Sequence, residues 1–129
     1  MKKGMKKKAY KKQRKRVLKE FRKWQPLIIP SWGVTYLWSD RWPKRKSASV
    51  AVECQADWRY RNVVYTCYLP VLALLVDHEL ELTIIHELVH PHLDELVQQR
   101  KEKDFLDHLE HVTQNLAMAI RYMSQRDEA

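Results

Sequence analysis

The stretch His86-Glu87-Leu88-Val89-His90 is the part of this sequence whose residue types and spacing best suit chemistry. On a helix, residues four apart lie on one face and about 6 Å apart along the axis, so His86 and His90 can bind the same metal ion. Glu87 is rotated by about 100° from His86, a position from which a carboxylate can act as a general base on a water molecule. The pattern therefore predicts a divalent metal site with a general base beside it.

The alternative is a polar helix turn whose histidines form only local hydrogen bonds. Against it, the stretch belongs to the most apolar predicted helix of the chain, in which unpaired His and Glu side chains would be costly to bury. A catalytic zinc site usually has three protein ligands, and two imidazoles with a carboxylate favour zinc over other divalent ions. We therefore expect one Zn²⁺ per chain, with its third ligand from elsewhere in the sequence.

The third ligand is expected from the next predicted helix, which offers Asp107, His108, Glu110 and His111. If Leu109 is at the centre of the apolar face of that helix, Glu110 and His108 lie about 100° to either side of it. Asp107 and His111 then lie closer to solvent. These positions favour Glu110 as the third ligand, with His108 and His111 as alternatives.

Other residues leave the details of the site open. Thr113 and Ala117 follow Glu110 on the same side of the helix, and their small size would let the two helices approach closely. His92 is close to the motif but follows Pro91, so its direction cannot be derived from helical spacing. Tyr122, like His108 and His111, is a further candidate donor to a developing negative charge.

Two helices must position these residues. The first is expected to begin at Asp77, a good N-cap residue, and to end or kink at Pro91, which lacks a backbone N–H. The second begins near Asp104, and its large apolar residues recur every three or four positions, which predicts one core-facing side. That predicted face consists of Phe105, Leu109, Val112, Leu116, Ile120 and Met123.

Three strands are predicted upstream, at residues 33–39, 48–57 and 62–69, because polar and apolar residues alternate there or β-branched residues accumulate. The short gap between the last two predicts an antiparallel hairpin. In that hairpin Cys54 is expected roughly opposite Cys67, either as a cross-strand disulfide or, as we favour, as two buried free thiols. The fold class is therefore α+β: an N-terminal helix, a three-stranded, mainly antiparallel sheet and two further helices.

The charge of the chain is concentrated at its N-terminus. Residues 1–23 carry 13 Lys and Arg but only one acid, whereas the rest of the chain has a net charge of −4, which leaves +8 for all 129 residues. We expect a flexible basic arm at 1–9, one domain at 10–129, and a helix at 7–24 that ends before Pro26 and Pro30. Its apolar stripe consists of Tyr10, Val17, Phe21 and Trp24.

This basic region can attract nucleic acid without sequence specificity or an anionic membrane surface, or it can simply keep the chain soluble. The residues predicted to bind anions are Lys6, Lys7, Lys8, Lys11, Lys12, Arg14, Lys15 and Arg16. The longest apolar stretch, residues 68–76, is too short to span a bilayer, and no apolar core of a secretion signal follows the basic residues. With only two cysteines, these features predict a cytoplasmic protein.

The order of elements and the motifs His86-Glu87-Leu88-Val89-His90 and Glu110-His111-Val112, the latter followed by Leu116-Ala117, resemble the minimal zincin metallopeptidases. The similarity is to the glutamate-liganded branch, which includes small peptidases of phages and bacteria, and covers roughly residues 10–123. The chain lacks the further histidines of metzincins and the paired C-x-x-C motifs of Spartan-like proteases.

The resemblance implies a zinc ion held by His86, His90 and Glu110, with Glu87 activating water to hydrolyse a peptide or protein substrate. It also implies that the strand at 62–69 is an edge strand that pairs with an extended peptide, and, for a phage protein, a place in the host cytoplasm. Two other hypotheses remain. One is a nucleic-acid-binding protein, and the other is a regulatory protein with a non-catalytic zinc site whose fourth position is filled by His92 or His111.

Overall fold

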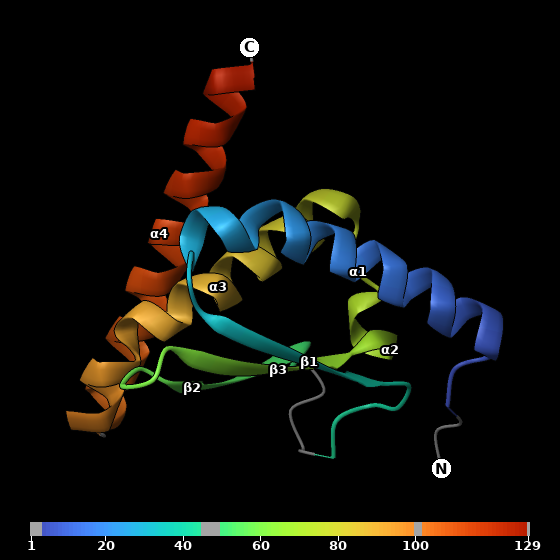
Figure 1. Cartoon of the computed structure of the whole chain (residues 1–129), viewed down its shortest axis with the longest axis horizontal. Coiled ribbons are helices and arrows are strands. Elements are labelled where there is room, and N and C mark those ends of the chain that lie inside the picture. Colours follow the sequence, from blue (N-terminus) through green and yellow to red (C-terminus); the bar gives the residue numbers. More distant parts are fainter. Residues whose placement is uncertain (1–3, 45–49, 100–101, 129) are drawn as a thin grey trace.

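A computed structural model describes residues 4–44, 50–99 and 102–128, apart from the side chains of 95, 97–99, 127 and 128. The chain has an α+β fold in which helices cover a small sheet (Figure 1). The elements are α1 (Lys7–Ile28), β1 (Gly33–Ser39), β2 (Val52–Asp57), β3 (Asn62–Tyr68), α2 (Leu69–Leu72), α3 (Asp77–Gln99) and α4 (Lys103–Glu128). The first two residues of the strand predicted at 48–57, residues 48 and 49, lie outside the described residues.

The sheet has the order β1-β3-β2, with β1 parallel and β2 antiparallel to β3. The expectation of a mainly antiparallel sheet is therefore wrong, since one of the two pairings is parallel. The expectation that the strand at 62–69 lies at an edge is also wrong, because β3 is the central strand. The hairpin places β3 beside β2, and the long connection after β1 lets β1 pair with the opposite side of β3.

The β2–β3 hairpin is confirmed, but its register differs by two residues from the expected one. Cys54 pairs with Tyr65, and Cys67 pairs with Val52, so the two cysteines are not opposite each other. Both are free thiols; Cys67 is buried and Cys54 is partly buried. Burial raises the pKa of each thiol to about 12, and the negative charge of Glu87 acts in the same direction.

The core lies between the sheet and the helices α1 and α3. The predicted stripe of α1 is confirmed, since Val17, Phe21 and Trp24 are all buried. The Phe21 ring lies 4.8 Å from the ring of Tyr36 and 5.1 Å from that of Tyr65, centroid to centroid. These contacts fix α1 against β1 and β3.

Helix α1 is longer than predicted, because it continues past Pro26 to Ile28. Proline leaves the carbonyl of the residue four positions earlier without its helical partner, and here that residue, Arg22, is exposed. Water can therefore satisfy the carbonyl. Near the helix end, His92 Nε2 hydrogen-bonds the Ile28 carbonyl oxygen.

Helix α3 also continues through its proline, so it does not end at Pro91, which was one of the two predicted outcomes. Pro91 cannot donate to the carbonyl oxygen of Glu87, and the buried Tyr65 hydroxyl donates to that oxygen instead, at 2.9 Å. The sheet thus supplies the hydrogen bond that the proline removes. Asp77 is the first residue of the helix rather than its cap, and the Glu79 carboxylate accepts a hydrogen bond from the Val76 N–H at 3.1 Å.

Helix α4 packs with a face that is rotated from the predicted one and shares Leu109 and Ile120 with it. Leu109, Thr113 and Ala117 are buried against α3, whereas Val112, Leu116 and Met123 of the predicted core face are 43–64% exposed. The C-terminal half of α4 projects beyond the rest of the molecule (Figure 1). None of the helices in the described ranges is long and apolar enough to cross a membrane.

Candidate metal centre

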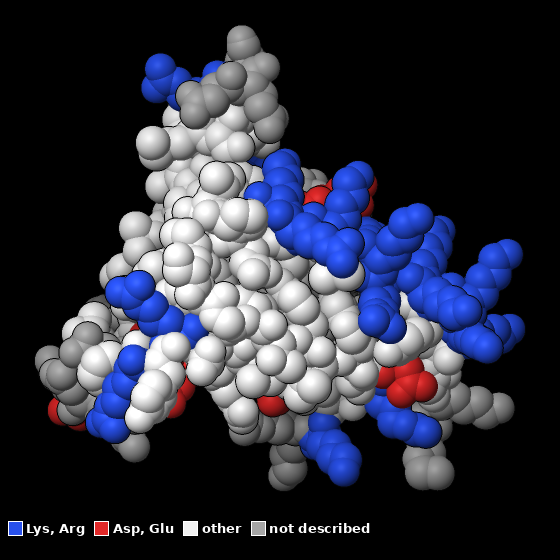
Figure 2. All heavy atoms as spheres, in the orientation of Figure 1, with Lys and Arg blue, Asp and Glu red and all other residues white. Residues whose placement is uncertain are grey.

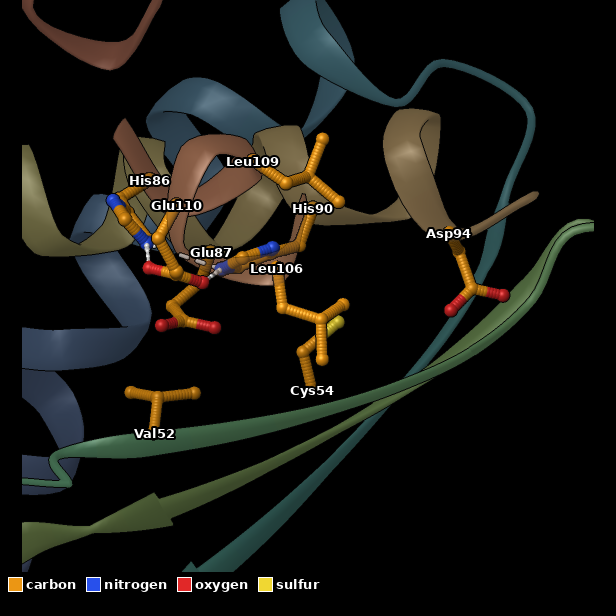
Figure 3. Close-up of a pocket in the computed structure, with 9 residues that line it drawn as sticks. All are labelled: Val52, Cys54, His86, Glu87, His90, Asp94, Leu106, Leu109 and Glu110. Carbon is orange, nitrogen blue, oxygen red and sulfur yellow. Dashed lines mark hydrogen bonds and ion pairs between the residues drawn. The ribbon is translucent and has the colours of Figure 1, made fainter. Parts of the chain in front are cut away.

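Side chains from two helices converge at one point of the cleft between α3, α4 and β2 (Figure 3). His86 and His90 are on successive turns of α3, and their Nε2 atoms are 3.0 Å apart. Glu110 of α4 places one carboxylate oxygen 3.1 Å from His86 Nε2 and the other 3.0 Å from His90 Nε2. Within the described part of the chain, these three form the one group of His, Cys, Asp and Glu side chains that could hold a metal ion.

The spacing of these donor atoms suits a small divalent cation. Ligand bonds of about 2.0–2.1 Å in a tetrahedron place neighbouring donor atoms roughly 3.3 Å apart, close to the separations of 3.0 and 3.1 Å found here. The donor set of two imidazoles and one carboxylate is typical of zinc. The residues therefore fit the metal that the sequence predicts.

The imidazoles are also held in the form that binds metal. Gln114 Oε1 lies 2.7 Å from His86 Nδ1, and an amide oxygen can only accept, so Nδ1 donates a hydrogen bond to Gln114 while Nε2 faces the other donor atoms. Burial lowers the pKa of His90, and the proximity of His86 lowers it further, whereas Glu110 opposes the shift. A neutral imidazole is the form that coordinates a metal.

Glu87 lies beside the three candidate ligand residues but is not one of them. Its carboxylate points into the cleft toward Val52 of β2 (Figure 3). Burial, and to a smaller extent the negative charge of Glu110, raise the pKa of Glu87 to about 8. A carboxyl group with a pKa near neutrality can both accept and release a proton.

Two hollows of the surface adjoin the cluster. One hollow of about 420 Å³ is lined by the donor residues, by Cys54 of β2 and by Leu106 and Leu109 of α4. A second hollow of about 630 Å³ is lined by apolar residues such as Val71, Leu75 and Leu82. Both hollows are lined by Val52, His86 and Glu87, so the cleft continues past the donor atoms along β2.

The alternative ligands do not join the cluster. His108 and His111 are exposed on α4, and Tyr122 is 62% exposed farther along the same helix. His92 is exposed and bonds the end of α1, where its ring also lies 6.3 Å from that of Trp32. Glu79 lies two turns before His86, and its carboxylate bonds the start of α3 and not the cluster.

The sequence reasoning missed Gln114 and the contribution of β2. Gln114 follows Glu110 by four residues, so the spacing that placed Glu110 toward α3 could also have identified it. Nothing in the local pattern of β2 indicated that Val52 and Cys54 would face the motif, because that depends on the order of strands in the sheet. Asp94, one turn after His90, also lines the cleft and was not singled out.

Comparison of the chain with protein-family models, with curated proteins and with solved structures gave no match. A function for this chain must therefore be inferred from the geometry and chemistry of the cleft.

Proposed function

We propose that this protein is a zinc-dependent metallopeptidase of the zincin type, which hydrolyses peptide bonds in the cleft between α3 and β2. The observation that carries the proposal is the meeting of His86, His90 and Glu110 at one point, with the Glu87 carboxyl beside them. A structural zinc site needs no acid in that position. A hydrolytic site does need a group that moves protons.

His86 and His90 would hold the metal through their Nε2 atoms, and Glu110 through its carboxylate. A bound Zn²⁺ would supply a Lewis acid that polarises a carbonyl group and lowers the pKa of water toward about 7. Gln114 keeps the His86 ring oriented by accepting from Nδ1. This arrangement matches the general finding that partners of the ligands fix their orientation and tautomer.

Glu87 is the proposed general base. Its carboxylate takes a proton from water as the water attacks the scissile carbonyl carbon, and then transfers that proton to the leaving amine nitrogen. A cation held by the neighbouring residues would oppose the effect of burial and favour the ionised carboxylate that this step requires.

The cleft favours an extended chain over a compact small molecule. β2 is an edge strand, since β3 is its one strand partner in the described sheet, and it runs beside both hollows. An extended peptide can pair with such an edge through backbone hydrogen bonds and so present a peptide bond to Glu87. In this proposal β2 takes the part that the sequence analysis assigned to the strand at 62–69.

The regulatory alternative, a zinc site without turnover, requires a fourth protein ligand. His92 and His111 were the candidates, and His92 bonds the Ile28 carbonyl while His111 is exposed. Glu110 is 59% exposed, so one side of the cluster is accessible to solvent and substrate. This favours an open site over a closed one.

The test is hydrolysis of casein and of a quenched fluorescent peptide library by the zinc-loaded protein, with zinc content measured on the same samples. Glu87→Gln should reduce the rate by about 10²–10⁴-fold and retain zinc. His86→Ala should lose both zinc and activity, whereas the exposed control His111→Ala should keep both. Cleavage by Glu87→Gln at the parent rate would show that the proposed base is wrong.

A further inference from the structure

The exposed side of α1 carries a continuous band of positive charge. Figure 2 shows Lys and Arg side chains gathered along this helix, over the end of the molecule that contains its N-terminal half. Glu20 is the single acid of the helix. The band consists of eight exposed cations: Lys7, Lys8, Lys11, Lys12, Arg14, Lys15, Lys19 and Arg22.

Helical geometry places most of these cations in two adjacent rows. At 100° per residue, Lys7, Lys11, Lys15 and Arg22 fall within an arc of roughly 80°, and the second row lies beside it. From Lys7 to Arg22 the band is about 22 Å long. That length corresponds to roughly six or seven phosphates along one strand of a duplex, at 3.4 Å each.

The band belongs to helix α1, which includes Lys7 and Lys8 of the arm expected at 1–9 and most of the helix predicted at 7–24. Arg16, predicted to bind anions, is instead turned toward the body, where it pairs with Asp77 at 3.1 Å and bonds the carbonyl oxygens of Leu72 and Leu75. Lys23 pairs with Glu81 of α3 at 2.9 Å. Among the described residues, no ion pair engages the cations of the two rows.

We infer that this face of α1 binds the phosphate backbone of duplex nucleic acid without reading its sequence. Regularly spaced cations on a rigid helix can contact successive phosphates and release their counterions, which gives affinity but no base specificity. The inference concerns a surface separate from the metal centre and does not depend on the proposed peptidase activity.

The packing of α1 argues against a membrane or a single strand as the partner. A helix that lies on a membrane inserts an apolar face into it, but Val17, Phe21 and Trp24 are at most 2% exposed. Proteins that bind single strands stack bases on exposed aromatic rings. On α1, Phe21 and Trp24 are buried and Tyr10 is partly buried, so the cationic face lacks such rings.

The experiment measures binding of the full chain to a fluorescent duplex of about 20 base pairs, by anisotropy, between about 50 and 200 mM salt. The variant Lys11→Gln/Lys15→Gln/Lys19→Gln removes three charges from the band. The control Lys44→Gln/Lys103→Gln/Arg126→Gln removes three exposed charges from elsewhere, so the net charge of the two variants is equal.

The parent should bind with affinity that falls steeply with salt. The α1 variant should bind about 10–100-fold more weakly, with a slope of log affinity against log salt reduced by about 2–3, whereas the control should remain close to the parent. Glu87→Gln should bind like the parent, which separates this inference from the peptidase proposal.

Three results would overturn the inference. Equal losses in the two triple variants would mean that net charge, and not the α1 face, determines binding. Stronger binding to phosphatidylserine-containing vesicles than to the duplex would assign the face to membranes. Tighter binding to a single strand of the same length would point to a stacking surface that the structure does not place on α1.

Discussion

Helices α1 and α4 are both long and amphipathic, yet they pack in opposite ways. On α1 the large apolar residues of the central stripe, Val17, Phe21 and Trp24, are buried, with Phe21 fully enclosed between the sheet and the helices. On α4 the buried residues include Thr113 and Ala117, while Leu116 and Met123 face outward at 43% and 64% exposure. The buried positions of α1 are thus those of its large apolar stripe, whereas on α4 small residues are buried while several large apolar residues are exposed.

The difference is explained by what each helix contributes. Glu110 and Gln114 both reach His86 from α4, so the side of that helix that contains them must face α3. Thr113 and Ala117 share this side, and their small side chains let the helix backbones lie close enough for a short carboxylate side chain to reach the imidazoles. The Thr113 hydroxyl is satisfied within its own helix, bonding the Leu109 carbonyl at 2.8 Å. The site, and not the apolar stripe, therefore sets the rotation of α4.

The largest contrast should appear when a large side chain is removed from each helix. Phe21→Ala should lower the free energy of unfolding by about 3–5 kcal/mol, because it leaves a cavity in the core. Leu116→Ala should change it by only about 0.5 kcal/mol, because Leu116 is substantially exposed. Urea unfolding followed by circular dichroism measures both, and similar losses would mean that the α4 stripe is covered.

Replacing the small buried residue Ala117 of α4 by a larger one should lower both the stability of the fold and the affinity of the site for zinc. Ala117→Leu should cost about 1–3 kcal/mol of stability, since the fully buried position has no room for the added atoms. It should also weaken zinc binding by moving Glu110 away from the histidines. Ala119→Leu, on the exposed side of the same helix, is the matched control for zinc titration and urea unfolding. Unchanged zinc affinity in Ala117→Leu would argue against the close approach.

Removing the hydrogen bond to His86 should affect the metal more than the fold. Gln114→Ala should weaken zinc binding by about 10–100-fold, because the ring loses the acceptor that fixes its tautomer. Chelator competition measures the affinity, with the neighbouring exposed Asn115→Ala as control. Gln114→Glu keeps an acceptor and should bind zinc more tightly than Gln114→Ala; the reverse order would show that Gln114 only fills space.

The smallest effect is expected at Glu81, which links the two helices through α3. Its carboxylate is 2.9 Å from Lys23 of α1 and 2.8 Å from Arg121 of α4. Burial alone would raise the pKa of Glu81, but the hydrogen bonds from Lys23 and Arg121 outweigh it and lower the pKa below its usual 4.5. Glu81→Gln should therefore cost about 1 kcal/mol at neutral pH.

That difference has a defined pH dependence. A depressed pKa in the folded state contributes stability above pH 4.5, the usual value of the group, and the contribution disappears as pH falls through the lower folded-state pKa. Thermal unfolding of parent and Glu81→Gln should therefore converge in acid. A gap that stays constant with pH would mean that the charge of Glu81 contributes nothing.

Local sequence patterns predicted the elements that depend on local spacing. The three strands, the burial of Val17, Phe21 and Trp24, and the turn-by-turn placement of His86 and His90 follow from periods of two and of about 3.6 residues. The position of Glu110 on the side of α4 that faces His86 and His90 also follows from its angle around the helix relative to Leu109, and not from hydrophobicity alone.

The features that were wrong depend on contacts between distant segments. The central position of β3 follows from its pairing with β1, and no property of residues 62–68 by themselves distinguishes a central strand from an edge strand. Pro91 does not end its helix, because Tyr65, 26 residues earlier in the chain, replaces the missing donor. The side of α4 that faces α3 is the one with Glu110 and Gln114, which contact His86, and not the one with the most large apolar side chains.

The hydrogen bond from Tyr65 to the Glu87 carbonyl fastens the proposed base to the middle of the sheet. The Tyr65 ring is fully enclosed and contacts Phe21. The backbone of Glu87, the residue expected to move protons, is therefore hydrogen-bonded to a buried aromatic cluster. Substitutions far from the cleft that loosen this cluster should therefore impair turnover before they unfold the chain. The proposed peptidase activity would therefore depend on the stability of the fold through the Tyr65 hydroxyl group.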